Sequence, residues 1–291
     1  MLNPGYNEIM NLVIAVIAPG AMGAAVGKRL ADHGVKVLTS LAGRSASTIA
    51  RAGEAGMIGA SDEEIAAADF MLSILPPGDA LSLAERFAPV LQASNAKPVY
   101  VDCNAINPAT LDRVAAAIAP SGCPLVDAGI IGAPPRGNDA GPRFYASGEA
   151  APRLATLREC GLDVRVLEGP PGAASALKMS YAGITKGTQA IGAAMMLAAT
   201  RAGSAEALVK ELAFSQKEML ALFKQQLPMM PAKAYRWIAE MQEIAGFVAA
   251  DPAAHDLYEG AAHFYERIAE DFSADKKDVA ALMDFLGKSA R

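Results

Sequence analysis

The chain has 291 residues, a formal net charge of −5, 52% hydrophobic residues and 20% charged residues. This composition excludes a disordered chain, which needs low hydropathy and high charge, and the length suits one large domain or two ordinary ones. The acidic balance and the lack of a basic stripe provide no field that would attract a polyanion, so no nucleic-acid partner is expected.

Cysteine usage and hydropathy indicate a protein of the cytoplasm. Cys103, Cys123 and Cys160 are too far apart for a CxxC motif, and their odd number does not suit a disulfide framework. The first apolar stretch, 12–18, is too short for a signal peptide and lacks a basic start. Segment 172–199 contains two lysines, so we expect a buried helix there and no membrane contact.

Short apolar runs alternate with alanine-rich stretches over the first part of the chain, which is the pattern of βα units around a parallel sheet buried on both faces. Strands are predicted at 12–17, 35–39, 70–75, 99–102, 125–128, 143–146 and 164–167. Helices are predicted at 22–33, 46–55, 62–68, 79–91, 108–119 and 151–159. The expected fold class is an α/β Rossmann-type doubly wound sheet in a domain of residues 1–171.

Apolar residues recur at helical spacing after the Pro170-Pro171-Gly172 segment. Helices are predicted at 172–202, 205–225, 231–249, 252–271 and 276–286. Residues 172–291 are therefore expected to form an all-α C-terminal domain.

A glycine-containing loop, 18–23, follows the first predicted strand and opens the next helix. Gly20 would let the main chain approach a pyrophosphate, Gly23 would let the helix pack close to the strand, and the helix N-terminus offers N–H groups to phosphate. Ala18 replaces the usual first glycine, which requires a negative φ there. The predicted cofactor loop comprises Pro19, Gly20, Ala21, Met22 and Gly23; a purely structural βα turn is the alternative.

The end of the second predicted strand favours NADP over NAD. An NAD site usually has an Asp or Glu here for the ribose 2′-OH, but segment 38–45 has no carboxylate. Arg44 can pair with a 2′-phosphate and Ser45 adds a hydroxyl, although the two residues also suit a surface arginine and a simple N-cap. Other strand ends should line the same site, where Leu75, Pro76 and Asn104 are the candidates, or else ordinary turn residues.

Lys178 lies among alanines and glycines on a helix that should be largely buried. Ala182 and Thr185 share its stripe of the helix, and Tyr181 lies beside that stripe. A buried amine is disfavoured in its charged form, so its pKa falls toward the working pH and it can exchange a proton with a hydroxyl or carbonyl group. The alternative is a lysine whose ammonium group reaches the surface.

Three segments occur in the order found in β-hydroxyacid dehydrogenases: the 18–23 loop, the segment 127–133 and the helix that carries Lys178. The chain resembles this family over its whole length; the family includes 3-hydroxyisobutyrate, tartronate-semialdehyde and 6-phosphogluconate dehydrogenases. Segments 178–187 and 232–241 are most similar to a bacterial subgroup of 6-phosphogluconate-dehydrogenase-like NAD(P) oxidoreductases. That subgroup has a C-terminal domain of unknown function.

This resemblance implies an NADP-dependent oxidoreductase with Lys178 as the catalytic acid/base. It implies a cradle for the substrate carboxylate and hydroxyl formed by Gly129, Ile130, Ile131 and Gly132. Ala182 stands where the family usually has a substrate-binding asparagine, and the two isoleucines stand where relatives have small or hydroxyl residues. A bulkier or less polar substrate than a simple 3-hydroxy acid would suit these departures.

Four further residues are candidates to replace the missing polar contacts: Tyr181, Thr185, Tyr235 and Arg236. Arg236 could clamp a carboxylate. The alternative for Tyr235 and Arg236 is packing and an ion pair with Glu240.

The resemblance also implies a small-molecule substrate and a homodimer formed through the helical domain. His33, His255 and His263 have no accompanying acid or cysteine pattern, so neither a metal site nor a catalytic triad is expected. Two other functions stay open. One is an imine reductase, which shares the architecture but usually lacks the lysine, and the other is a non-catalytic NADP-binding protein.

Overall fold

The computed structural model describes residues 12–137 and 139–287, which form two compact units, one ending at Met179 and one beginning at Ser180. The predicted boundary at 171/172 lies just before helix α8 (Ala173–Arg201), whereas the units divide inside this helix. Because α8 is continuous across the division, its first two turns belong to the first unit.

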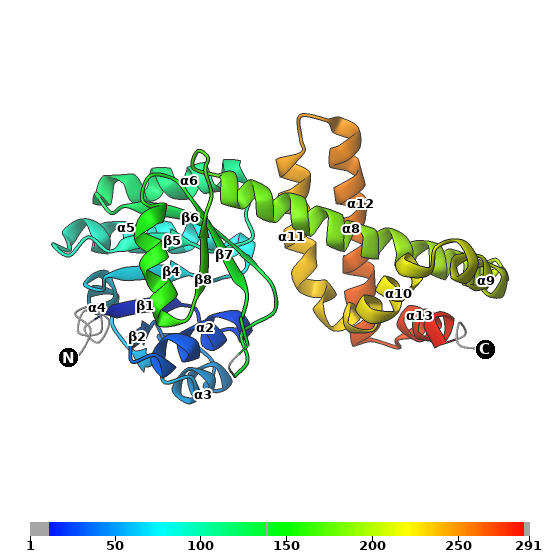
Figure 1. The fold of residues 1–291 in the computed structure, drawn as a ribbon, viewed down its shortest axis with the longest axis horizontal. Coiled ribbons are helices and arrows are strands. Elements are labelled where there is room, and N and C mark those ends of the chain that lie inside the picture. The colour runs from blue at the N-terminus through cyan, green and yellow to red at the C-terminus, as the bar shows by residue number, and fades with distance from the viewer. Residues whose placement is uncertain (1–11, 138, 288–291) are drawn as a thin grey trace. The chain divides into compact units, whose positions relative to one another are not determined.

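A single sheet organises the first unit (Figure 1). Its strands are β1 (Val13–Ile17), β2 (Lys36–Thr39), β3 (Ile58–Gly59), β4 (Phe70–Ser73), β5 (Val99–Asp102), β6 (Leu125–Ile131), β7 (Arg143–Ser147) and β8 (Asp163–Val166). They lie in the order β3-β2-β1-β4-β5-β6-β7-β8, and every neighbouring pair is parallel except β6 with β7. The run β3-β2-β1-β4-β5-β6 is the strand order of dinucleotide-binding folds, so the predicted Rossmann-type sheet is confirmed.

The sheet is buried on both faces. Ile14 and Val16 of β1 pack in one core cluster, while Ala15 and Ile17 pack in another on the opposite face, as the alternation of strand side chains requires. The helices of this unit are α2 (Ala21–Asp32), α3 (Ala46–Glu54), α4 (Asp62–Ala66), α5 (Ala80–Ala93), α6 (Pro108–Ile118) and α7 (Ala151–Leu154). Burial on both faces explains why the strands read as continuous apolar runs.

Three local predictions in this unit are wrong. The short strand β3 was not expected, because both of its residues are exposed and carry no alternating pattern. Helix α7 ends at Leu154, and the rest of the predicted helix is a 3-10 turn, Ala155–Cys160. Strand β6 continues to Ile131, beyond the predicted end at residue 128, because β7 pairs with it along that extension.

The second unit is helical, as predicted. After α8 it contains α9 (Ala205–Ser215), α10 (Lys217–Gln226), α11 (Ala234–Phe247), α12 (Pro252–Ser273) and α13 (Lys277–Gly287). The single helix predicted at 205–225 is wrong, because Gln216 (φ −137°, ψ 49°) leaves the helical conformation and separates α9 from α10.

Helices α8, α11 and α12 pack together in the second unit (Figure 1), and aromatic and ionic contacts join them. Trp237 packs edge-to-face on Tyr265 with ring centroids 5.2 Å apart, and the Tyr265 hydroxyl donates to the main-chain oxygen of Lys186 over 2.6 Å. The Lys186 ammonium is ion-paired with Glu240. Among the described residues, no helix has the length and hydropathy needed to cross a membrane.

Candidate active site

The loop between β1 and α2 has the geometry of a phosphate-binding turn. Gly20 is the N-cap of α2, and no side chain caps this helix, so its first-turn N–H groups have no side-chain acceptor. A Cβ at Gly20 would meet nothing within 4 Å, whereas one at Gly23 would lie 2.1 Å from the main-chain oxygen of Ala18. Gly23 therefore permits the close approach of helix and turn, and Gly20 leaves the helix N-terminus open to a ligand phosphate.

Ala18 replaces the first glycine of the fingerprint without left-handed strain. Among the described non-glycine residues, positive φ occurs at Lys97 and Lys276, so Ala18 has the negative φ that its Cβ requires. Pro19 is buried, and its carbonyl accepts a hydrogen bond of 3.2 Å from the Arg51 guanidinium on α3. The loop thus fits the pyrophosphate of a dinucleotide, and α3 supports it from one side.

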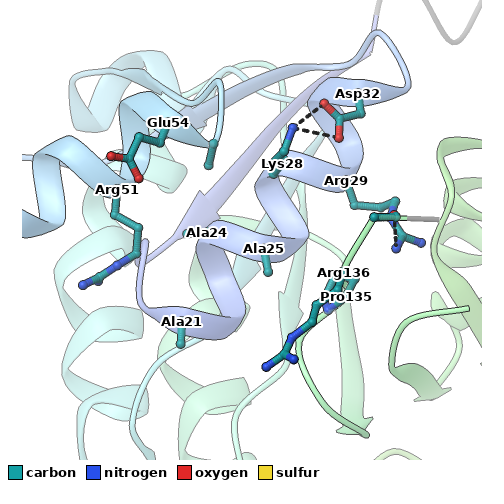
Figure 2. Close-up of a pocket in the computed structure, with 12 residues that line it drawn as sticks. Ala21, Ala24, Ala25, Lys28, Arg29, Asp32, Arg51, Glu54, Pro135 and Arg136 are labelled. Atoms are coloured by element: carbon teal, nitrogen blue, oxygen red, sulfur yellow. Dashed lines mark hydrogen bonds and ion pairs between the residues drawn. The ribbon is translucent and has the colours of Figure 1, made fainter. Parts of the chain in front are cut away.

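A cavity of about 370 Å³ lies along the outer flank of α2, between α3 and the loop that follows β6 (Figure 2). Ala21, the first residue of α2, lines it, and the side chains of Arg51 and Arg136 lie toward the same end. Lys28 on this flank pairs with Asp32 over 2.8 Å. The flank of the predicted cofactor loop is therefore positively charged near the start of α2.

The residues after β2 have modest structural roles of their own. Arg44 is exposed, and its main-chain N–H donates to Leu41. The Ser45 hydroxyl accepts from the Thr48 N–H over 3.3 Å, so Ser45 is the N-cap of α3. The Ser45 hydroxyl already accepts this capping hydrogen bond, so a hydrogen bond to a nucleotide would be an additional one. The Arg44 side chain is exposed.

One carboxylate, Asp62, is linked to the end of β2 through Arg86. Arg86 donates to the Ser40 hydroxyl and forms an ion pair with Asp62, with 2.6 Å between guanidinium nitrogen and carboxylate oxygen. Asp62 is therefore engaged by a guanidinium and does not present a free acceptor for a ribose hydroxyl.

Asn104 joins the ends of two strands. Its side-chain oxygen accepts from the Leu75 N–H over 2.6 Å, and its amide donates to Ser73 and Asp102 over 2.8 Å each. The Asn104 side chain is buried, so its structural role is to hold the β4 and β5 loops together at the carboxyl edge of the sheet. Leu75 and the exposed Pro76 stand at that edge beside it.

Lys178 lies in the second turn of α8, within the first unit. Its Nζ donates to the main-chain oxygen of Ile130 on β6 over 2.8 Å. Burial lowers the pKa of Lys178 from 10.5 to about 8. An amine with this pKa exists in both protonation states near neutral pH, which is what general acid/base chemistry requires.

Strand β6 positions the start of α8. The buried carboxylate of Asp127 accepts from the N–H groups of Ala174 and Ser175 over 3.0 Å each, from the Ser175 hydroxyl over 2.6 Å and from the Ser147 hydroxyl over 2.7 Å. At Gly129, a Cβ would lie 2.8 Å from the Ala174 oxygen and 3.2 Å from the Lys178 Cβ. The helix therefore packs directly on the main chain of β6 at Gly129. A side chain at this position would prevent that close approach.

The predicted substrate cradle lies at the carboxyl end of β6. Gly129, Ile130 and Ile131 are strand residues that pair with β7, and the Ile130 side chain belongs to the hydrophobic core. The main-chain oxygen of Ile130 accepts the hydrogen bond from the Lys178 amine. Gly132 is exposed at φ +134°, a conformation that favours glycine, and it ends the strand.

The remaining substrate candidates belong to the second unit. The Thr185 hydroxyl donates to the main-chain oxygen of Tyr181 over 2.8 Å, as helical threonines commonly do. Tyr181, Tyr235 and Arg236 are exposed, and the Arg236 guanidinium lies 5.7 Å from the centroid of the Tyr235 ring. The alternative ion pair with Glu240 is replaced by the Lys186–Glu240 pair.

Sequence reasoning missed the residues that support the site: Asp127, Ser147, Ser175, Arg51 and Arg136. The first three meet only because β6, β7 and α8 come together in the fold, and Arg51 reaches Pro19 from a different helix. The sole local signal was the segment 127–133, which the resemblance singled out without a role for its aspartate. Among the described residues, no cluster of three or more His, Cys, Asp or Glu side chains is placed to hold a metal ion.

The fold and loop define a dinucleotide-binding protein with a helical second unit. The family model for the NAD binding domain of 6-phosphogluconate dehydrogenase matches residues 13–158, and the chain belongs to this family. A second model, for a domain of unknown function (DUF1932), matches residues 199–268 in the helical unit. The predicted resemblance to 6-phosphogluconate dehydrogenase is thereby confirmed, and so is the predicted C-terminal domain of unknown function.

Individual relatives agree with this assignment. An uncharacterised 28.5 kDa protein of Methanothermus fervidus, from the 5′ region of 7S RNA, is 27% identical over 217 residues, which are 74% of this chain and 82% of that one. A solved conserved protein of unknown function, described as structurally similar to 3-hydroxyacid dehydrogenases, is 29% identical with a TM-score of 0.68, covering 93% of this chain and 99% of that one. Mycobacterium tuberculosis 3-hydroxyisobutyrate dehydrogenase with L-serine has the same TM-score at 22% identity, covering 94% and 98%.

Imine reductases share the fold as well. A Myxococcus stipitatus imine reductase in complex with NADP+ is 18% identical with a TM-score of 0.52, covering 94% of this chain and 99% of that one. A variant of it in complex with NAD+ is 19% identical with a TM-score of 0.53, covering 94% and 98%. The chain therefore has an NAD(P)-binding fold of the type found in hydroxyacid dehydrogenases and imine reductases.

Proposed function

We propose that this protein is an NADP-dependent oxidoreductase that transfers hydride between the nicotinamide and a carbonyl or alcohol carbon of a small hydroxy acid or carbonyl metabolite. The observation that carries the proposal is the Lys178 amine, held at the Ile130 carbonyl with a pKa lowered to about 8. The proposal assigns Lys178 as the general acid/base.

The nicotinamide, when bound, supplies or accepts the hydride. An ammonium group has three donors, and the Ile130 oxygen accepts from one of them, so the other two protons of Lys178 can face a substrate oxygen. In reduction, Lys178 gives a proton to the developing alkoxide; in oxidation, its neutral form accepts the hydroxyl proton. General acid/base catalysis of this kind typically contributes about 10² to 10⁴ in rate.

NADP is the proposed cofactor, with NAD the less favoured one. The open N-terminus of α2 at Gly20 suits the pyrophosphate, which both cofactors share. The exposed guanidinium of Arg44 suits a 2′-phosphate, and Asp62 is occupied by Arg86. The cofactor loop of the proposal includes Pro19, Ala21, Met22 and Gly23, and Leu75, Pro76 and Asn104 stand at the same edge of the sheet.

A moderately apolar substrate suits the proposed site. The Ile130 side chain is buried in the core, so β6 presents the main-chain oxygen of Ile130 to Lys178, and Ala182 and Ile131 provide no polar side chain for a substrate. Tyr181, Thr185, Tyr235 and Arg236 stay the proposed source of polar contacts from the helical unit.

A homodimer formed through the helical unit is part of the proposal. On α8, Tyr181, Ile184, Thr188, Ile191 and Met195 recur at intervals of three and four residues, which is the spacing of a helix-pairing stripe. Ile184 is 68% exposed and Ile191 is 52% exposed, although both are large and apolar. Such a stripe suits burial against the same stripe of a second copy.

The proposed location is the cytoplasm, where thiols stay reduced. Cys103, Cys123 and Cys160 are free and buried, as suits that compartment.

An imine reductase is the second candidate, supported by the shared fold and by the apolar character of Ala182 and Ile131. Lys178 argues against it, since imine reductases usually lack this lysine. A non-catalytic NADP-binding protein is the third candidate and rests on the fold alone.

One screen separates these functions. Purified protein is mixed with NADPH or NADP+ and a panel of hydroxy acids, keto acids, aldehydes and cyclic imines, and the nicotinamide absorbance is followed. Turnover of hydroxy acids or carbonyls supports the proposal. Turnover restricted to imines supports an imine reductase, and NADPH binding without turnover of any panel member supports a binding protein.

A further inference from the structure

The start of α8 is held by a single buried carboxylate. Asp127 is 1% exposed and accepts four hydrogen bonds, two from main-chain N–H groups of the first helical turn and two from the hydroxyls of Ser147 and Ser175. A negative charge at this place also interacts favourably with the positive end of the helix dipole. The carboxylate is therefore fully satisfied, and it fixes where the helix begins on the strand.

Lys178 lies one helical turn after Ala174 and Ser175, the main-chain partners of Asp127, and its side chain contacts the same strand. Its Nζ contacts the oxygen of Ile130, three residues after Asp127 on β6. Between these two contacts, Gly129 lets the main chain of α8 lie directly on the strand. Helix and strand are thus joined at Asp127, Gly129 and Ile130, and the Asp127 contact determines the axial position of the helix.

We propose that Asp127 is a positioning residue for the Lys178 amine: by holding the first turn of α8 on β6, it keeps that amine at the Ile130 carbonyl and out of bulk water. This deepens the function proposed above and rests on it for its catalytic meaning. The positioning itself concerns only contacts within the first unit and can be measured without cofactor or substrate.

A purely electrostatic role makes the opposite prediction. Removing a nearby negative charge while the amine stays in place would lower the pKa of Lys178 further, because the ammonium loses a favourable interaction. Removing the positioning contact would let the amine reach water, and its pKa would rise toward 10.5. The sign of the change in the Lys178 pKa therefore distinguishes a positioning role of Asp127 from an electrostatic role.

The test uses the full-length protein with lysines labelled by reductive ¹³C-methylation, and the pKa of Lys178 is followed by NMR. The Lys178 resonance is assigned by its absence in Lys178→Arg. In Asp127→Ala we expect the pKa to rise by about one unit or more. In Asp127→Asn, which keeps an acceptor for the N–H groups and a partner for the Ser175 hydroxyl, we expect it to stay at or below the wild-type value.

Two further variants keep the test decisive. Ser175→Ala removes only the 2.6 Å hydroxyl contact and should raise the pKa by a smaller amount, which gives a readout even where Asp127→Ala does not fold. Asp251→Ala removes the cap of α12, where Asp251 accepts from the N–H groups of Ala253 and Ala254, and should leave the pKa of Lys178 unchanged. Asp251→Ala is a matched control, because it also removes a carboxylate that caps a helix, but in the other unit.

The outcomes are distinct. A pKa that rises in Asp127→Ala and Ser175→Ala, but not in Asp127→Asn or Asp251→Ala, supports the proposal. An unchanged or lowered pKa in folded Asp127→Ala overturns it, as does an unchanged pKa in Ser175→Ala where Asp127→Ala does not fold. If the pKa moves as expected but Lys178→Met keeps full turnover, the proposed reaction fails while the positioning stands.

Discussion

The Lys178 amine lies 2.8 Å from the main-chain oxygen of Ile130, so the proposed acid/base of the helix is oriented by the strand it packs against. A carbonyl acceptor does not neutralise the ammonium as a carboxylate would. Desolvation therefore dominates, and the pKa of Lys178 is lowered to about 8. A fixed direction and a lowered pKa together are what general acid/base catalysis near neutral pH requires.

The lowered pKa should appear in the stability of the protein. Between about pH 8 and pH 10.5 the unfolded chain carries a proton on Lys178 that the folded chain has lost, so the free energy of unfolding rises with pH, by up to about 3 kcal/mol. Lys178→Met removes this contribution. Urea denaturation of both proteins between pH 7.5 and 9.5 checks it. Burial also raises the pKa of the Cys103 thiol and of the Tyr265 hydroxyl, but the contributions of these groups are present in both proteins and cancel in the difference. Parallel pH dependences would contradict the lowered pKa.

The two glycines of the cofactor loop should respond differently to alanine. In Gly23→Ala the new Cβ meets the Ala18 oxygen at 2.1 Å, so we expect a loss of about 2 to 3 kcal/mol in stability and loss of cofactor binding. Gly20→Ala has open space and should keep the fold, while NADPH binding weakens by about tenfold or more. Thermal denaturation and NADPH fluorescence titration measure both. Unchanged cofactor affinity in Gly20→Ala would argue against phosphate binding at this turn.

Arg44 and Arg51 should separate the two cofactors. Arg44→Gln removes the proposed 2′-phosphate contact and should weaken NADPH binding by about ten- to hundredfold with little change for NADH. Arg51→Gln loosens the Pro19 carbonyl contact and should weaken both cofactors to a similar extent. Parallel titrations of NADPH and NADH decide. Tighter binding of NADH to the wild-type protein, or equal losses in Arg44→Gln, would contradict the assigned NADP preference.

The exposed stripe of α8 should control oligomeric state. Charges in the double variant Ile184→Glu and Ile191→Glu would be buried in the proposed dimer, so the protein is expected to become monomeric. Leu222→Glu on α10, also an exposed apolar position, should stay dimeric. Light scattering after size-exclusion chromatography gives the masses. A wild-type protein that is monomeric at micromolar concentration would refute the dimer.

The parts of the fold that local sequence specifies were predictable. The strand, loop and helix around Gly20 and Gly23 follow one another in the chain, and the close approach at Gly23 is a local consequence of that turn. The burial of Lys178 was predictable from the small residues around it on the helix, whereas its proposed role came from the family resemblance. The largely parallel sheet was predictable from the alternation of apolar runs and helices, although the order of its strands was not.

Features that depend on distant parts of the chain were not predictable. The extension of β6 to Ile131 requires β7 as a partner, and the role of Asp127 requires α8, which begins more than forty residues later. The break at Gln216 lies in a segment where apolar residues recur at helical spacing, so no residue type there predicted the end of a helix. Asn104 was predicted as a cofactor contact from its position, and its hydrogen bonds with Leu75, Ser73 and Asp102 became visible only in the fold.

The most direct test of the central claim compares kcat/KM of wild-type protein and Lys178→Met on the best substrate of the screen, with NADPH affinity measured in parallel. We expect Lys178→Met to lose about 10² to 10⁴ in kcat/KM while NADPH affinity is kept. Lys210→Met, an exposed lysine on α9, should retain full activity. In the reducing direction the wild-type rate should fall as pH rises through about 8, since the protonated amine is the donor. Full turnover by Lys178→Met would contradict the account.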